Sequence, residues 1–153
     1  MSTHDGNTHP SAFAELWQQA MQGADRFGHR QHVHVTWLAV RRFGVQEAIA
    51  VISDGIRRTA RYAGAPQKYH ETVSRAWVEL VGHHASRSGS ESDSFDSFTE
   101  RNPALLDKRL LMRFYRPATL ASAAARSHWV EPDLAPFPWQ PALLGPQDAR
   151  GAV

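Results

Sequence analysis

The chain has 153 residues, enough for one domain with a substantial core. Hydrophobic residues make up 42% of it and charged residues 21%, which excludes a globally disordered chain. Fifteen arginines and two lysines against fifteen acidic residues leave a net charge of +2 without a concentrated basic stripe, which argues against nucleic acid as a partner.

The N-terminal part of the chain predicts a flexible leader followed by a helix. Residues 1–10 are rich in small polar residues and lack the apolar stretch of a signal peptide. Ser11 can cap a helix that continues to about Gln22, and Gly23 follows it. No run approaches the roughly 20 apolar residues of a membrane span, so we expect a cytoplasmic protein with no membrane partner.

Two further helices are predicted, separated by a glycine. The first covers about residues 28–43 and the second residues 45–63, and Gly44 between them is a typical C-terminal helix signal. The second helix is amphipathic, and Gly55 lies beside its apolar stripe. A glycine there permits close packing of a neighbouring helix, at some cost in helix propensity.

The fourth main helix is predicted from about Lys68 to His84. Residues 86–97 are polar and rich in serine, which indicates a loop, either a plain connection or a lid. Shorter helical segments are expected at 95–101, from Pro103 onward, and at 118–127.

Prolines dominate the end of the chain and predict an extended tail, which Phe137 and Trp139 can anchor to the helical body. The expected fold is therefore all-α: a single-domain helical bundle of four main helices, with shorter C-terminal helices and a Pro-rich extended tail. The domain is expected to cover residues 11–140, between the leader and a flexible tail at 141–153.

Three histidines are predicted to point inward from two of these helices. On a helical wheel, His29 and His32 share the apolar face of the second helix, whereas His34 points elsewhere. His70 lies on the apolar face of the fourth helix, and His84 lies on that face about 21 Å further along. The wheel therefore predicts a site between these two helices formed by His29, His32 and His70.

Several chemistries fit three convergent imidazoles. They are candidate ligands of zinc or another transition metal, or candidate catalytic acid–base groups, since histidine titrates near neutral pH. A haem axial ligand is a weaker alternative, and the absence of acidic residues on both apolar faces argues against a di-iron site. The chain contains no cysteine, so thiolate ligands and nucleophiles are excluded.

Four further residues are candidates for binding a substrate or small-molecule ligand. Tyr69 and Thr72 flank His70 and are expected to support it as hydrogen-bond donors. Arg113 beside Tyr115 is expected to bind an anionic group, within the densest basic segment of the chain, residues 108–116.

The order of several motifs resembles a family of small bacterial all-helical proteins of uncharacterised function. The motifs are Phe-x-His-x-x-His at 27–32, Tyr-His-x-Thr at 69–72, Leu-Leu-Asp-Lys-Arg at 105–109, and Val-Glu-Pro-Asp-Leu at 130–134. The resemblance covers about residues 27–138. It implies that His29, His32, Tyr69, His70 and Thr72 belong to a recurring pattern, and it implies no reaction.

Two hypotheses about function follow. The first is a small enzyme or enzyme-like protein that uses the three histidines on a small molecule. The second is a non-catalytic interaction or ligand-binding module, in which the histidines are structural and the basic segment or the Pro-rich tail binds a partner. A three-histidine metal site like that of DinB-like bundles is an analogy at the level of the fold. The amphipathic helices also leave room for a homodimer.

Overall fold

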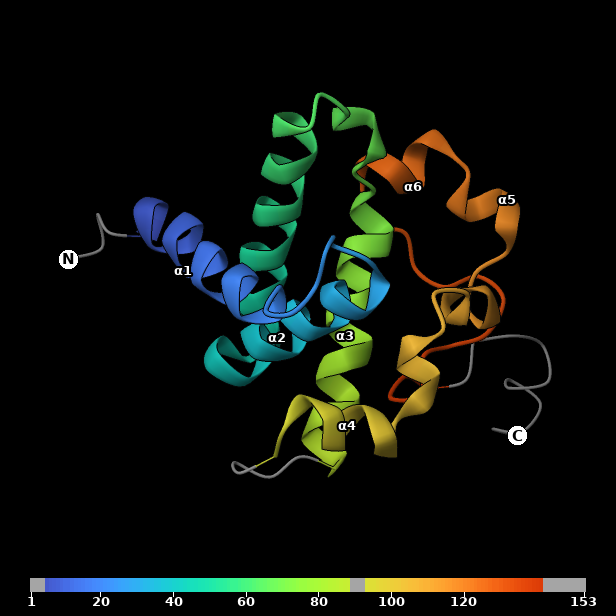
Figure 1. The fold of residues 1–153 in the computed structure, drawn as a ribbon. Coiled ribbons are helices and arrows are strands. Elements are labelled where there is room, and N and C mark those ends of the chain that lie inside the picture. Colours follow the sequence, from blue (N-terminus) through green and yellow to red (C-terminus); the bar gives the residue numbers. More distant parts are fainter. Residues whose placement is uncertain (1–4, 89–92, 142–153) are drawn as a thin grey trace, which may run out of the picture.

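The computed structural model describes residues 5–88 and 93–141, and throughout these residues the regular structure is helical (Figure 1). Within this part of the chain no helix is long and apolar enough to cross a membrane. The elements, in chain order, are α1 (Asp5–Ala20), α2 (His29–Tyr62), η2 (Pro66–Lys68), α3 (Glu71–Ser88), α4 (Phe95–Arg101), η3 (Pro103–Leu106), η4 (Leu110–Arg113), α5 (Pro117–Leu120) and α6 (Ala123–Ser127).

The helix α2 is bent at Gly44, so it consists of the two helices that the sequence predicts. Gly44 has φ 81° and ψ 166°, a conformation outside the helical region that side chains other than glycine rarely adopt. The predicted break at this glycine is confirmed. The second half of α2 ends at Tyr62, and Gly64 follows it with a φ of +73° and a hydrogen bond from Ala65 N to Ala60 O. This arrangement is a Schellman motif.

The helix α1 begins earlier than the sequence suggests. Residues 5–10 are helical, so the predicted leader 1–10 is too long, and residues 1–4 lie outside the described part of the chain. Pro10 is inside the helix.

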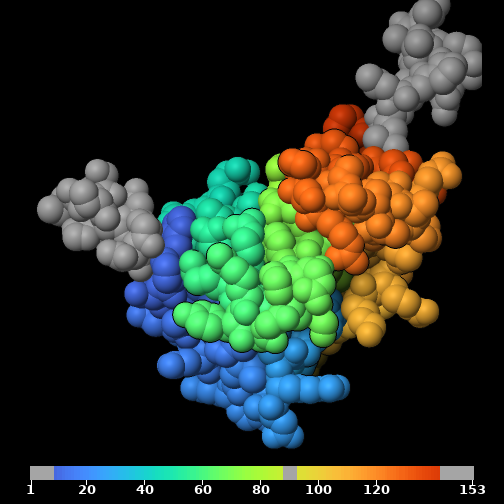
Figure 2. All heavy atoms as spheres, turned by 90° about the horizontal axis from the view of Figure 1, so that it is seen from above, coloured from blue at the N-terminus to red at the C-terminus, as the bar shows by residue number. Residues whose placement is uncertain are grey.

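The segment after α3 is more irregular than predicted. The predicted loop 86–97 is helical at both ends, because α3 continues to Ser88 and α4 begins at Phe95; residues 89–92 are outside the described part. The helix expected after Pro103 is two short 3-10 turns, and the one expected at 118–127 is divided between α5 and α6. This C-terminal segment packs against α3 and the first half of α2 (Figures 1 and 2).

The core consists of two adjoining clusters of buried side chains. The first lies between α2, α3 and the C-terminal segment, and it includes the fully buried Phe137, so the predicted anchoring of the tail is confirmed at that residue. The second joins α1, α2 and α3 through Leu16, Ile52 and Val78. The irregular C-terminal segment is thus part of the main core and not an appendage.

Two glycines let the helices approach closely. A Cβ atom on Gly55 would lie 2.2 Å from the ring of Phe13 in α1, which confirms the predicted close contact at this position. A Cβ atom on Gly82 in α3 would lie 2.3 Å from Cγ2 of Val45 in α2. Real Cβ atoms do not approach other carbon atoms so closely, so both contacts require glycine.

Candidate functional site

His70 lies just before α3 and uses both ring nitrogens in hydrogen bonds to the backbone. Its Nε2 donates to the carbonyl oxygen of Leu120 at 2.7 Å, and its Nδ1 accepts from the amide of Val73 at 3.2 Å. A carbonyl only accepts, so the proton of the neutral ring is on Nε2. The imidazole therefore joins the start of α3 to the end of α5.

His29, the first residue of α2, makes a similar connection to a different turn. Its Nε2 donates to the carbonyl oxygen of Leu105 in η3 at 2.9 Å, and its ring packs edge-on against Trp77, with ring centroids 4.7 Å apart. Burial lowers the pKa of His29, and the bond to the Leu105 carbonyl acts in the opposite direction.

His32 lies one turn further along α2 and is held in its neutral form. Burial lowers its pKa to about 4, and the neighbouring His29 contributes in the same direction. The centroids of the two rings are 6.4 Å apart, and Phe27 packs edge-on against His32 at 6.1 Å. An acid–base group works best when its pKa is near the working pH. The pKa of His32 is well below neutral pH, so this side chain is poorly suited to that role.

The structure does not gather the three histidines into a metal-ligand group. Within residues 5–88 and 93–141, no three side chains of histidine, aspartate, glutamate or cysteine lie together in a way that could hold a metal ion. His29 and His32 are neighbours on α2 as predicted, but His29 and His70 are directed to two different carbonyls, 15 residues apart in the chain.

Thr72 and Tyr115, two of the predicted substrate-binding residues, are buried. Their hydroxyls bond to the backbone of residues 128–130. The Thr72 hydroxyl donates to the carbonyl of His128 at 2.7 Å and accepts from the amide of Val130 at 3.1 Å. The Tyr115 hydroxyl donates to the Val130 carbonyl at 2.6 Å, and burial raises the pKa of Tyr115 well above its usual value. Both side chains thus hold the stretch around residue 130 in place.

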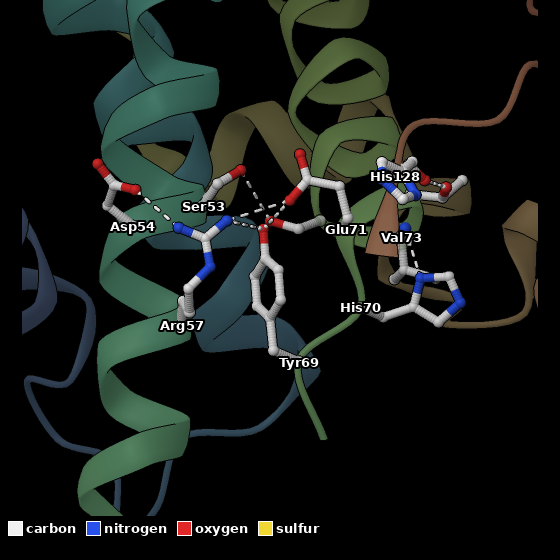
Figure 3. A network of polar contacts seen from close by, with 10 residues as sticks. Ser53, Asp54, Arg57, Tyr69, His70, Glu71, Val73 and His128 are labelled. Carbon is white, nitrogen blue, oxygen red and sulfur yellow. Dashed lines mark hydrogen bonds and ion pairs between the residues drawn. The ribbon is translucent and has the colours of Figure 1, made fainter. Parts of the chain in front are cut away.

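Tyr69 belongs to a separate polar network on the other side of the α3 N-terminus (Figure 3). Its hydroxyl donates to Glu71 Oε1 at 2.7 Å, and Arg57 donates to the same carboxylate oxygen at 3.2 Å and to Asp54 at 3.0 Å. The Arg57 guanidinium also lies over the Tyr69 ring, 4.7 Å from its centroid. Burial raises the pKa of Tyr69. In Figure 3, Tyr69 and His70 point to opposite sides of the chain.

Arg113 is exposed and belongs to a short stretch of chain whose exposed side chains we call the basic surface: Lys108, Arg109, Met112, Arg113 and Arg116. Among the described residues, the one ion pair of its four cations is between Arg109 and Asp107, at 3.8 Å. Met112 is 43% exposed, and the nearby Leu134, whose amide bonds to the carbonyl of Phe114, is 46% exposed. Cations and exposed apolar side chains therefore occur together here.

Along the chain, the basic surface lies between the two residues whose carbonyls accept hydrogen bonds from His29 and His70. Leu105 precedes its first member and Leu120 follows its last. A third connection closes the same segment from the tail: Asp133 accepts from the amide of Arg116 at 2.9 Å and from the hydroxyl of Thr119, and these bonds lower the pKa of Asp133.

The other predicted histidine positions agree with the wheel. His34 stacks on Phe95 with ring centroids 4.1 Å apart, away from His29 and His32, and His84 bonds to Asn102 at 3.1 Å. The sequence analysis does not identify the role of Arg57. A signal was present: Arg57 and Asp54 are three residues apart on one helix face.

The chain has no match among known proteins in any of three comparisons, with protein-family models, with curated proteins and with solved structures. The resemblance of its motifs to a family of small bacterial helical proteins stays a prediction.

Proposed function

We propose that the protein is a non-catalytic interaction module, and that the basic surface binds an acidic segment of a partner protein. The observation that carries this proposal is the position of the histidine contacts. His29 and His70 bond to the carbonyls at the two ends of the segment that carries the basic surface. In this role the histidines fix the geometry of a binding surface and take no part in chemistry.

The hydrogen bonds of the candidate site support a structural role. In His70, Nε2 carries the proton that it donates to the Leu120 carbonyl, and Nδ1 accepts from the Val73 amide, so neither nitrogen has a free lone pair for a metal or a substrate proton. Thr72 and Tyr115 are buried with their hydroxyls bonded to backbone. Of the four predicted substrate-binding residues, Arg113 is the exposed one, and it belongs to the basic surface.

The composition of the basic surface favours a protein partner of opposite charge. Complementary charge increases the association rate and selects the partner, whereas buried apolar contacts supply much of the affinity. Met112 and Leu134 are two of the three exposed large hydrophobic side chains among the described residues, and both lie in this part of the molecule. An acidic segment with one or two apolar side chains fits these features.

A fluorescently labelled glutamate-rich peptide containing leucine is a direct probe of this surface. We expect anisotropy measurements to show binding that weakens with added salt, because exposed charge pairs are screened. The double variant Arg113→Gln/Arg116→Gln should weaken binding about tenfold, since two charge-assisted contacts are lost.

The matched control is Arg26→Gln/Arg87→Gln, which removes two exposed arginines elsewhere and gives the same net charge. Its affinity for the peptide should stay close to that of the native protein. Equal weakening by both double variants, or no binding of the peptide at low salt, would contradict the proposal.

His70 distinguishes this function from the enzyme hypothesis. His70→Ala removes two hydrogen bonds and leaves the Leu120 carbonyl without its donor, so we expect the free energy of unfolding to fall by about 2 kcal/mol. Amide hydrogen exchange should become faster in residues 106–122. The metal content of purified protein, measured by elemental analysis, should not change.

The enzyme hypothesis for His29, His32 and His70 makes the opposite prediction. It requires a stoichiometric metal or an activity that His70→Ala abolishes, with unchanged hydrogen exchange at residues 106–122. That outcome would contradict the structural role of the histidine contacts and support the enzyme hypothesis.

A further inference from the structure

The second half of α2 carries a different feature, on the end of the molecule where α2 meets α3 (Figure 2). Arg58, Arg61 and Tyr62 line an open cavity of about 410 Å³ there. Their spacing of three and four residues places their side chains on one face of the helix. In Figure 2 this end of α2 and the start of α3, both green, form an accessible face beside the orange α5–α6 region.

Arg58, one of the residues that line this cavity, has a side-chain nitrogen without a hydrogen-bond partner. Among the described side chains, its Nη2 is the one buried nitrogen or oxygen atom with no hydrogen-bond partner. Leaving a buried donor of a charged group unpaired costs free energy, so such atoms in folded proteins call for a ligand, a water molecule or an ion.

The neighbouring acidic residues bond to Arg57 and not to Arg58. Asp54 and Glu71 both bond to Arg57, and Tyr69 shares the same carboxylate oxygen of Glu71. Within the part of the chain that the structure describes, neither Arg58 nor Arg61 has an ion pair. Two positive charges therefore lie on this face without an ion-pair partner among the described residues.

The C-terminal end of α2 repels an anion less than a helix end with unpaired carbonyls would. The carbonyls of Thr59, Ala60 and Arg61 accept from the amides of Ala63, Ala65 and Gly64. These bonds satisfy the carbonyls of the last turn, which otherwise carry the negative end of the helix dipole.

Tyr62 adds an apolar surface to the two cations. It is 91% exposed, the largest exposed fraction among the exposed large hydrophobic side chains. An exposed aromatic ring is a stacking surface for a flat ring of a ligand. A guanidinium presents paired donors to the oxygens of a phosphate or carboxylate.

From the orphaned Arg58 nitrogen, the uncompensated Arg61 and the exposed Tyr62 around one cavity, we infer that this end of α2 is a binding site for a small aromatic molecule bearing an oxyanion. The site uses none of the residues of the basic surface, so it stands or falls independently of the proposed protein partner. Phosphate and carboxylate both present the paired oxygens that a guanidinium binds, so both are used as probes.

The test uses the full chain with phenyl phosphate, benzoate, inorganic phosphate and benzylammonium as probes. NMR spectra of the ¹⁵N-labelled arginine side chains should show saturable shifts of Arg58 and Arg61 with phenyl phosphate at millimolar concentration. Benzoate should give the same shifts if a carboxylate suffices, and benzylammonium should give none. Phenyl phosphate should bind more tightly than inorganic phosphate, because Tyr62 stacks on the ring.

Variants assign the binding to the residues. Arg58→Gln should weaken binding of phenyl phosphate about tenfold, and it should leave the melting temperature of the free protein unchanged or higher, since it removes the unpaired nitrogen. Tyr62→Ala should abolish the preference for phenyl phosphate over inorganic phosphate. Arg26→Gln, at an exposed side chain outside both this site and the basic surface, is the control and should bind like the native protein.

Three results would overturn the inference. The first is the absence of saturable shifts, and the second is equal weakening by Arg58→Gln and Arg26→Gln. The third is equal affinity for phenyl phosphate and inorganic phosphate in the native protein, which would mean that the site holds an adventitious ion only.

Discussion

Replacing Gly55 by alanine should destabilise the fold by about 2 kcal/mol, although alanine is the better helix former. The new methyl group would lie 2.2 Å from the Phe13 ring. Phe13 is buried, so its ring cannot move away without opening the contact between α1 and α2. Urea unfolding followed by circular dichroism measures the change in the free energy of unfolding.

Phe13→Ala supplies the control, because it removes the ring that causes the clash. On its own this substitution should cost about 3–5 kcal/mol through the cavity that it leaves. In that background Gly55→Ala should become stabilising by up to about 1 kcal/mol, since the gain in helix propensity is no longer opposed. If alanine at 55 is equally tolerated with and without Phe13, the close contact is not what requires glycine.

The stability of the protein should fall between pH 6.5 and about pH 4 because of His32. Burial lowers the pKa of His32 to about 4, against 6.5 in the unfolded chain, so the unfolded state binds more protons in this interval. The contribution of neutral His32 to the free energy of unfolding is therefore fully present above pH 6.5 and is lost as the pH falls toward 4. A shift of this size corresponds to roughly 3 kcal/mol.

The contribution of His32 is separated from those of other histidines by comparison with His32→Gln. The pKa values of His29, His34, His83 and His84 are also lowered, and these side chains contribute to both proteins alike. The difference in unfolding free energy between the native protein and the variant should shrink as the pH is lowered. A difference independent of pH would show that His32 titrates alike in the folded and unfolded chains.

The main helices could be predicted from the sequence because their signals are local. The break at Gly44 and the close contact at Gly55 follow from where glycine stands in a helical pattern. The wheel also separated His34 from His29 and His32 correctly. The expected all-α bundle is therefore confirmed, with its C-terminal helices shorter and more irregular than predicted.

The partners of the histidines could not be predicted, for a physical reason. His29 and His70 bond to backbone carbonyls of Leu105 and Leu120, and every residue has a carbonyl, so nothing in the side-chain pattern marks these two. A helical wheel predicts that a side chain points into the core, but it does not predict which group that side chain contacts. The 3-10 turn η3 and the four-residue helix α5, which present these carbonyls, are too short to show a helical periodicity in the sequence.

The contact between Gly82 and Val45 has a consequence for how the chain folds. Val45 is the first residue after the bend at Gly44, and its methyl group fills the space over Gly82 in α3. Gly44 permits a bend in many directions, whereas the contact with α3 selects one. We therefore expect the two halves of α2 to form early as independent local helices, and the angle between them to become fixed in the same step in which α3 docks.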